Sequence, residues 1–338
     1  MSTGRSVGIK AVAEAAGVST TTVSHALNGK GRLADGTRRH VQEVAARLGY
    51  RPSAMARGLA GGRTGMLATI VSGVEEFALQ VGDFDYFLQL MHGATTEALR
   101  RGFSLTLLQA DSDPEVLDGL PLDGAIVIDP IAGDPIVERL SDRGVPVVTT
   151  GRELGGSEGA CWVDNDHVAG TREMLDHLAA AGSRRVALLT SPPVSSYAFD
   201  ARGAYVDWCA ARGQEPVIAE LTGNVSEGGA YAAAIELLGA GDPPDGIYAT
   251  LDRLALGALL AAEARGVAVP GRLRIAGCTD SEPSRKARPA LTALSLDPER
   301  LGREALDLLL DLVEDGASAM PHRLVPATVV PRASTAPR

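Results

Sequence analysis

The sequence predicts an all-α N-terminal domain followed by a larger α/β body of two doubly wound lobes. Three observations support this fold class. Apolar residues between positions 8 and 49 recur with the period of short helices, strands and helices alternate from position 65 onward, and the charge changes sign between the two regions. We expect residues 1–50 to form the helical domain, 51–64 a linker, 65–331 the body and 332–338 a disordered tail.

Three short helices are predicted in the N-terminal domain. The first presents one apolar face and ends at Gly17; the face comprises Ile9, Val12, Ala13 and Ala16. Ser19 is expected to cap a second helix that runs to about Leu27. A third helix is expected from about Thr37 to Leu48. A further helical stretch begins at Pro52, within the linker.

From position 65 the pattern is that of repeated strand–helix units. Strands are expected at 66–71, 103–109, 124–128, 145–150, 186–190, 217–221, 246–250, 273–278 and 323–330. Helices are expected at 87–101, 134–143, 167–181, 201–212, 228–238, 253–265 and 299–314. Such units build parallel doubly wound sheets, and this number of them exceeds one sheet. We therefore predict two lobes, with a ligand site in the cleft outside the carboxyl ends of the strands.

Charge and composition restrict the class of protein. Residues 1–63 carry ten Lys and Arg against three Asp and Glu, a net +7, whereas the remainder carries 22 against 39, a net −17. This asymmetry favours a small domain that binds a polyanion, joined to an acidic body. No apolar run is long enough for a transmembrane helix, and positions 1–10 lack the apolar segment of a secretory signal, so we expect a cytoplasmic protein. The three cysteines have no metal-ligand spacing, and neither a metal nor a cofactor is expected.

The segment from Ala11 to Ser24 has the pattern of a helix-turn-helix. Small alanines allow two helices to approach, Gly17 permits a tight turn, and Val18 and Val23 fill the junction. The second helix would then present its N-terminal residues to base edges in the major groove. The alternative is an ordinary helical hairpin, but the positive charge and the N-terminal position favour DNA binding.

At this point the sequence resembles the LacI/GalR family of transcription regulators. The stretches VAEAAGVSTTTVSHALNG and TRRHVQEVAARLGYRPSAMARGLAGGRTGMLATIV are similar to that family's headpiece and hinge. Later segments follow in family order, among them VDNDHVAG, DRLALGALLAAEARGVAVP and LRIAGCTD. The resemblance implies a helix-turn-helix headpiece, a periplasmic-binding-protein-like body, a homodimer, operator DNA as partner and a sugar or sugar-like effector, with no membrane partner. It also implies a repressor that the effector controls.

The resemblance assigns DNA contacts to the headpiece and the linker. Thr20, Thr21 and His25 occupy base-reading positions, with Ser24 on the same helix. Ser19, Thr22 and Asn28 occupy phosphate-contacting positions. Residues 52–60 match a hinge helix, in which Ala56 and Leu59 would enter the minor groove. The alternative is that Met55 and Leu59 are linker residues packed on the body.

Candidate effector residues are polar groups near predicted strand ends. They are Asp83, Asp85, Tyr86, Arg152, Asp164, Arg202, Asp252, Thr279 and Asp280. Carboxylates and arginines can form paired hydrogen bonds with vicinal sugar hydroxyls, and Tyr86, Phe87 or Trp162 could stack on a sugar face. Several have alternative interpretations: Asp252 could cap its helix, Asp164 could shape a turn with Asn165, and Arg202 could be a surface helix residue. Thr279 also stands where the family usually has an aspartate.

Two other functions are weaker hypotheses. An enzyme on the doubly wound body would need a catalytic motif, and the sequence contains no GxSxG, GxxxxGK[ST], HExxH or strand-following GxGxxG. No catalytic residue is therefore predicted. A sugar-carrier protein would need an export signal and would have no use for the basic headpiece.

Overall fold

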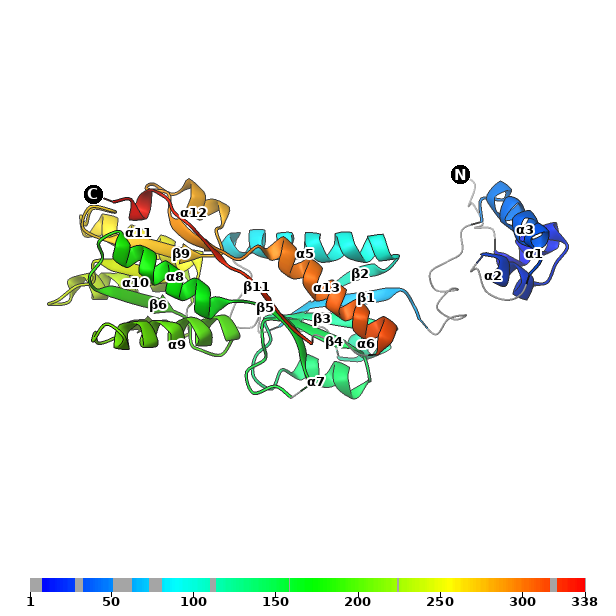
Figure 1. Ribbon diagram of the computed structural model, residues 1–338, viewed down its shortest axis with the longest axis horizontal. Helices are drawn as coiled ribbons and strands as arrows, with labels where there is room; N and C mark the ends of the chain where they lie inside the picture. Colours follow the sequence, from blue (N-terminus) through cyan, green and yellow to red (C-terminus); the bar gives the residue numbers. More distant parts are fainter. Residues whose placement is uncertain are drawn as a thin grey trace. The chain divides into compact units, whose positions relative to one another are not determined.

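The computed structural model describes residues 8–27, 33–50, 63–72, 81–109, 114–157, 159–223, 225–316 and 321–337. The chain divides into two compact units, Met1–Met66 and Leu67–Arg338. The first unit is the headpiece and the second is the body (Figure 1).

The described part of the headpiece contains three short helices around a small core. They are α1 (Ile9–Ala16), α2 (Thr20–Leu27) and α3 (Asp35–Arg47), as the apolar spacing predicted. Gly17 ends α1 with a left-handed φ of 66°, which a residue with a side chain rarely adopts. The Ser19 hydroxyl accepts a hydrogen bond from the Thr22 N–H at 3.1 Å and so caps α2. Helix α3 begins two residues before the predicted start.

The body contains two six-stranded sheets of similar strand order. In lobe 1 the order is β11-β5-β4-β3-β1-β2, and in lobe 2 it is β12-β10-β9-β8-β6-β7. The lobe 1 strands are β1 (Met66–Val71), β2 (Ser104–Gln109), β3 (Gly124–Ile128), β4 (Val147–Thr150), β5 (Cys161–Asn165) and β11 (His322–Val325). The lobe 2 strands are β6 (Val186–Thr190), β7 (Val217–Glu220), β8 (Gly246–Ala249), β9 (Arg274–Cys278), β10 (Thr292–Ser295) and β12 (Thr328–Val330).

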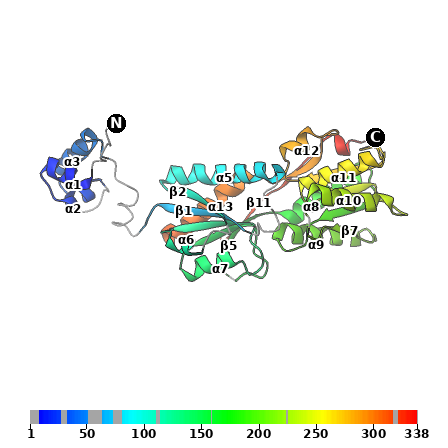
Figure 2. The same cartoon turned by 180° about the vertical axis from the view of Figure 1, so that it is seen from behind.

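Helices cover both sheets. Those of lobe 1 are α5 (Val81–Arg101), α6 (Pro114–Gly119), α7 (Pro135–Asp142) and α13 (Pro298–Asp315). Those of lobe 2 are α8 (His167–Ala180), α9 (Ser196–Ala210), α10 (Glu227–Gly239), α11 (Asp252–Ala264) and α12 (Glu282–Lys286). The chain passes between the lobes after β5, after β10 and between β11 and β12, so lobe 1 is completed by α13 and β11 from the end of the sequence (Figures 1 and 2).

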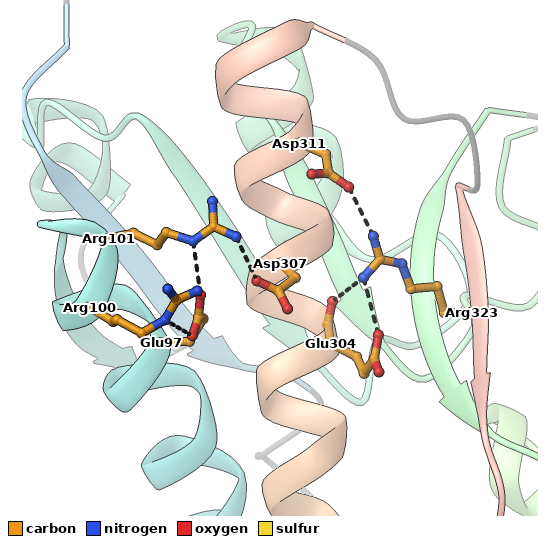
Figure 3. Close-up of polar contacts among 7 residues, drawn as sticks. All are labelled: Glu97, Arg100, Arg101, Glu304, Asp307, Asp311 and Arg323. Atoms are coloured by element: carbon orange, nitrogen blue, oxygen red, sulfur yellow. Dashed lines mark hydrogen bonds and ion pairs between the residues drawn. The ribbon is translucent and has the colours of Figure 1, made fainter.

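Helix α13 packs closely against α5 because each contributes a glycine to the contact. A Cβ at Gly93 would overlap the Glu299 carbonyl oxygen, and a Cβ at Gly302 would overlap the Leu90 carbonyl oxygen. Figure 3 shows the charged groups beside this contact. Arg101 bonds Glu97 at 2.9 Å on its own helix and Asp307 of α13 at 3.4 Å. A segment that is distant in sequence is thereby fixed to lobe 1.

Arg323 fixes strand β11 to helix α13 through ion pairs. Its guanidinium reaches Glu304 at 3.2 Å and Asp311 at 2.9 Å, both on α13 (Figure 3). The returning helix and strand are therefore joined to each other as well as to the sheet that they complete.

Several sequence-based predictions were wrong in detail. The strand expected at 323–330 is two strands, β11 and β12, because the chain changes lobes between them. Asp164 and Asn165 end strand β5 and do not shape a turn. The tail expected to be disordered at 332–338 is ordered through residue 337, because the buried Ser334 hydroxyl accepts from the Thr292 N–H at 2.8 Å and donates to the Ile275 carbonyl at 2.6 Å.

Candidate functional site

The outer face of α2 carries short polar side chains. Thr20 and Thr21 are exposed at its first turn, whereas Val23 and Ala26 are fully buried against the other two helices. His25 is half-buried, and its carbonyl accepts from the Arg38 guanidinium at 3.3 Å, which joins α2 to α3. The helix can therefore present its N-terminal hydroxyls outward without disturbing the headpiece core.

The predicted DNA-contacting residues fall into two groups. Ser19, Thr20, Thr21, Thr22, Ser24 and His25 lie at or on α2, and each is exposed or half-buried. Asn28, Ala56 and Leu59, with the hinge helix expected at 52–60, lie outside the described residues.

The body has a pocket between its two lobes, at the carboxyl ends of the strands. It encloses about 1010 Å³ of space, including the part open to solvent. Lobe 1 supplies residues that follow β1, β3 and β4, and lobe 2 supplies the first turns of α8, α9 and α11. The polar and aromatic lining consists of Ser72, Tyr86, Phe87, Asp129, Asp164, Asn165, His167, Ser195, Ser196, Tyr197, Thr250, Arg253, Cys278 and Thr279.

The lobe 1 wall carries two carboxylates. Asp129 comes directly after β3, and Asp164 lies near the end of β5 with 3% of its surface exposed. Burial raises the pKa of Asp164, but contacts with His167, 3.4 Å away, and hydrogen bonds from Ser196 and the Arg152 N–H together outweigh burial and hold the pKa below its ordinary value. Asp164 is therefore a stable anion at neutral pH.

Tyr86 lies where the two walls meet. It packs against the hydrophobic cores of both lobes. Burial raises the pKa of Tyr86 well above its ordinary value, and the charges of Asp129 and Asp164 raise it further. The phenol therefore stays protonated and can donate a hydrogen bond.

Among the described residues, the lobe 2 wall combines one arginine with three helix N-termini, of which those of α9 and α11 have no side-chain cap. Ser195 and Leu251 are the N-cap residues of α9 and α11, and neither side chain caps its helix. First-turn N–H groups are donors with a partial positive charge, suited to hydroxyl or other ligand oxygens. Arg253 is 6% exposed, and its Nε donates to the Val225 carbonyl at 2.8 Å.

Two residues with strained backbone conformations line the same pocket. Asp129 and Thr279 line the pocket with φ angles of 50° and 97°, in the left-handed region that residues with side chains rarely adopt. Such conformations persist where the surrounding structure fixes them, and they gather at ligand sites.

Three of the nine predicted effector residues line this pocket: Tyr86, Asp164 and Thr279. Asp83 lies in α5, and its side chain is not among those described. Asp85 is in α5 instead of in a loop after the first strand, because that helix begins six residues earlier than its apolar pattern indicated. Its carboxylate pairs with Arg285 at 3.3 Å and is not part of the lining.

The other four predicted effector residues make protein contacts outside the lining. Arg202 pairs with Glu220 of β7, because α9 begins at Ser196 and turns Arg202 toward the neighbouring strand. Arg152 pairs with Asp200 at 2.8 Å, and Asp280 pairs with Arg332 at 2.7 Å.

Asp252 is buried behind the pocket wall and accepts from the Ser281 N–H. Burial raises its pKa to about 6. The helix-cap interpretation of Asp252 was also wrong, since the N-cap of α11 is Leu251.

Sequence reasoning missed Asp129, His167, Tyr197 and Arg253 as pocket residues. The sequence does contain a signal for Asp129. This residue directly follows the wholly apolar strand β3, and the effector candidates were polar residues near predicted strand ends. His167 and Arg253 stand in the first turns of predicted helices, where the rule for parallel sheets places ligand groups. Trp162, considered as a stacking residue, stacks instead on His322 with 4.7 Å between ring centroids.

Comparison with known proteins identifies the family. Residues 8–53 match the model for bacterial regulatory proteins of the lacI family, and residues 175–335 match a periplasmic binding protein-like domain. The HTH-type transcriptional regulator CelR of Thermobifida fusca is 30% identical over 325 residues, 94% of either chain. The chain belongs to the LacI family of bacterial regulatory proteins.

Other members of the LacI family agree with this assignment. The HTH-type transcriptional repressor PurR of Haemophilus influenzae is 29% identical over 321 residues, 90% of each chain. A CelR–cellobiose complex is 27% identical, covers 97% of this chain and 99% of its own, and has a TM-score of 0.73. A lac repressor dimer bound to operator and the anti-inducer ONPF is 25% identical in sequence. The match covers 98% of this chain and 100% of the repressor chain, with a TM-score of 0.81.

Membership of the LacI family makes this chain a transcriptional regulator with a DNA-binding headpiece. The relatives named above are regulators and repressors, not enzymes. Among the described residues, no helix is long and apolar enough to cross a bilayer, and no group of three or more His, Cys, Asp or Glu side chains could hold a metal ion.

Proposed function

We propose that this regulator is a homodimeric repressor that recognises an operator through α2. Its affinity for the operator depends on an uncharged, sugar-like effector that binds in the pocket between the lobes. The main support for this proposal is the pocket. Residues of both lobes line it, so a bound ligand would contact both lobes at once. A relative of similar length binds cellobiose, and another binds operator and ONPF as a dimer. A dimer with two identical headpieces would match a pseudo-palindromic operator.

The charge of the pocket favours a neutral polyhydroxylated ligand. Asp129 and Asp164 accept hydrogen bonds from hydroxyl groups, whereas they would repel a phosphate or carboxylate. Among the described lining residues, Arg253 is the single arginine or lysine, and the Val225 carbonyl accepts a hydrogen bond from its Nε. Phe87 and Tyr86 offer aromatic surface for the apolar face of a sugar ring.

An exposed apolar edge of lobe 1 supports the proposed homodimer. Strand β2 is the edge strand of its sheet, and Leu107 on it is 59% exposed. Leu88 and Leu99 of the preceding helix α5 are 53% and 66% exposed. Large apolar side chains so exposed suit burial against a second copy. Leu107→Asp should therefore shift the protein toward monomers in light scattering.

A thermal-shift screen tests the effector proposal. Cellobiose, glucose and galactose should raise the melting temperature, whereas glucose 6-phosphate at equal concentration should not, because bound ligand stabilises the folded protein. Asp129→Asn should abolish the response. A panel in which only phosphorylated or acidic sugars stabilise the protein would contradict the assignment of a neutral effector.

Footprinting on the DNA upstream of the protein's own gene tests the operator proposal. With about six phosphate contacts, affinity should fall roughly 10³-fold between about 50 and 200 mM salt. Thr21→Ala should weaken binding to the operator more than to unrelated duplex, because a base contact and not a phosphate contact is lost. Leu59→Ala should act in the same direction if Leu59 enters the minor groove. Binding that is insensitive to salt and to sequence would exclude operator recognition by α2.

We also propose that the protein acts in the cytoplasm, because operator binding requires access to the bacterial DNA.

A further inference from the structure

Among the residues that the structure describes, two ion pairs near the pocket join the lobes. Arg152 follows β4 of lobe 1, and its Nη2 lies 2.8 Å from Oδ1 of Asp200 on α9 of lobe 2. The same residue's N–H donates to the Ser196 hydroxyl of α9 at 3.2 Å. The Asp200 side chain is 13% exposed and that of Arg152 33% exposed, so the pair is only partly open to solvent.

The second pair links the first turns of α5 to α12. Nη2 of Arg285 in lobe 2 lies 3.3 Å from Oδ2 of Asp85 in lobe 1. Arg285 also donates to the Asp280 carbonyl, and Arg332 holds the Asp280 carboxylate at 2.7 Å. Arg285 is therefore held within its own lobe by the Asp280 carbonyl, and its Nη1 also lies 3.9 Å from Oδ1 of the Asp280 carboxylate.

Both pairs border the pocket. Asp85 precedes the lining residue Tyr86, and Arg152 follows the lining residue Gly151. In Figures 1 and 2, α5 and α12 meet along the upper edge of the body, whereas α9 runs along the lower edge. The two contacts thus join the lobes through different elements, α5 with α12 and the end of β4 with α9.

We propose that Arg152–Asp200 and Asp85–Arg285 form a latch that holds the lobes closed over the pocket without an effector. Opening the cleft would separate both pairs, while each lobe would keep its own sheet and core. Partly exposed ion pairs are individually weak and are screened by salt, so this latch biases closure reversibly and does not lock it. It sets the closed fraction against which any effector must act.

The rate at which a thiol reagent labels Cys278 measures opening of the cleft, and the assay needs neither effector nor DNA. Cys278 lines the pocket and is 4% exposed, and burial raises its pKa, so it should react slowly with a thiol reagent while the cleft is closed. The more exposed Cys161 is first replaced by Ser. Cys209 lies in the core of lobe 2 with 1% exposure and reports unfolding instead of opening.

In the Cys161→Ser protein, Asp200→Asn or Asp85→Asn should raise the labelling rate of Cys278 about two- to fivefold, the range expected for losing one partly exposed pair. Both changes together should give roughly tenfold, with Cys209 unchanged. The charge-reversed pair Arg152→Glu with Asp200→Arg should return the rate toward its original value.

Asp118→Asn is the matched control. It breaks the 2.6 Å pair between Asp118 and Arg139, which both belong to lobe 1 and are about as exposed as Asp85 and Arg285. If the two cross-lobe variants label Cys278 no faster than this control, the latch does not exist. Equal acceleration at Cys209 would show that the substitutions unfold lobe 2, which also overturns the proposal.

Discussion

The headpiece and the body differ most in how their cores are built. Among the described residues, the buried core of the headpiece consists of alanines and valines, and larger side chains such as Leu27 and Tyr50 are only partly buried around it; the buried residues are Val12, Ala13, Ala16, Val23, Ala26, Val41, Val44 and Ala45. The body buries many leucines and isoleucines around two sheets, and glycines bring its helices into backbone contact. Small cores bury too little surface to tolerate losses, whereas large ones have a reserve. The DNA-reading unit is therefore the less stable part, and its failure need not affect the body.

The body has a different vulnerability, which is steric. Gly93 and Gly302 lie where helices α5 and α13 cross, and each faces the other helix's backbone. A backbone carbonyl cannot rotate away as a side chain does. The body thus tolerates lost volume better than added volume at this crossing.

The largest effect should follow Gly302→Val. Its side chain would collide with the Leu90 carbonyl and force α13 off α5, which should destabilise the body by about 3 kcal/mol or more. Calorimetry of the full chain should show the body's transition at lower temperature and the headpiece's unchanged.

Gly203→Ala is the control for this substitution. Gly203 lies within α9, and a Cβ there would meet nothing within 4 Å. Alanine should stabilise the helix by about 0.5–1 kcal/mol. If Gly302→Val is as harmless as Gly203→Ala, the close crossing does not limit the body.

Val23→Ala should produce the next largest effect, confined to the headpiece. Val23 is fully buried, and losing two methyl groups should cost about 1–2.5 kcal/mol of headpiece stability. Operator binding should weaken, while the thermal shift produced by an effector in the body stays the same. A parallel loss of effector binding would show that the two units do not fold independently.

A smaller, pH-dependent effect is expected for Glu97→Gln in the body. Hydrogen bonds from Arg100 and Arg101 outweigh burial and lower the pKa of Glu97 from 4.5 to about 2. Its stabilising contribution is therefore complete above pH 4.5 and is lost as the pH falls toward 2. Because the two arginines are 64% and 38% exposed, we expect only about 1 kcal/mol.

Urea unfolding at several pH values measures this contribution. The difference between Glu97→Gln and the parent protein should be largest above pH 5 and should shrink at lower pH. A difference that is independent of pH would assign the effect to packing and not to the charged contacts in Figure 3.

The sequence by itself determined the local structure and the family of this protein. Gly17, Ser19 and the apolar spacing specify the headpiece helices through contacts a few residues apart, and short, mostly apolar runs identified β3 and β6. The same local rules predicted two lobes, because the number of strand–helix units can be counted along the chain.

Only the tertiary structure decided which residues share the pocket. Arg202 and Arg253 are both arginines near a helix start, but a shift in where α9 begins sends the first to Glu220, and the register of α11 brings the second to the pocket. The order of the tail likewise depends on Ser334 meeting Thr292, more than 40 residues earlier in the chain. These outcomes depend on contacts between distant segments, and a pattern read along the chain carries no information about them.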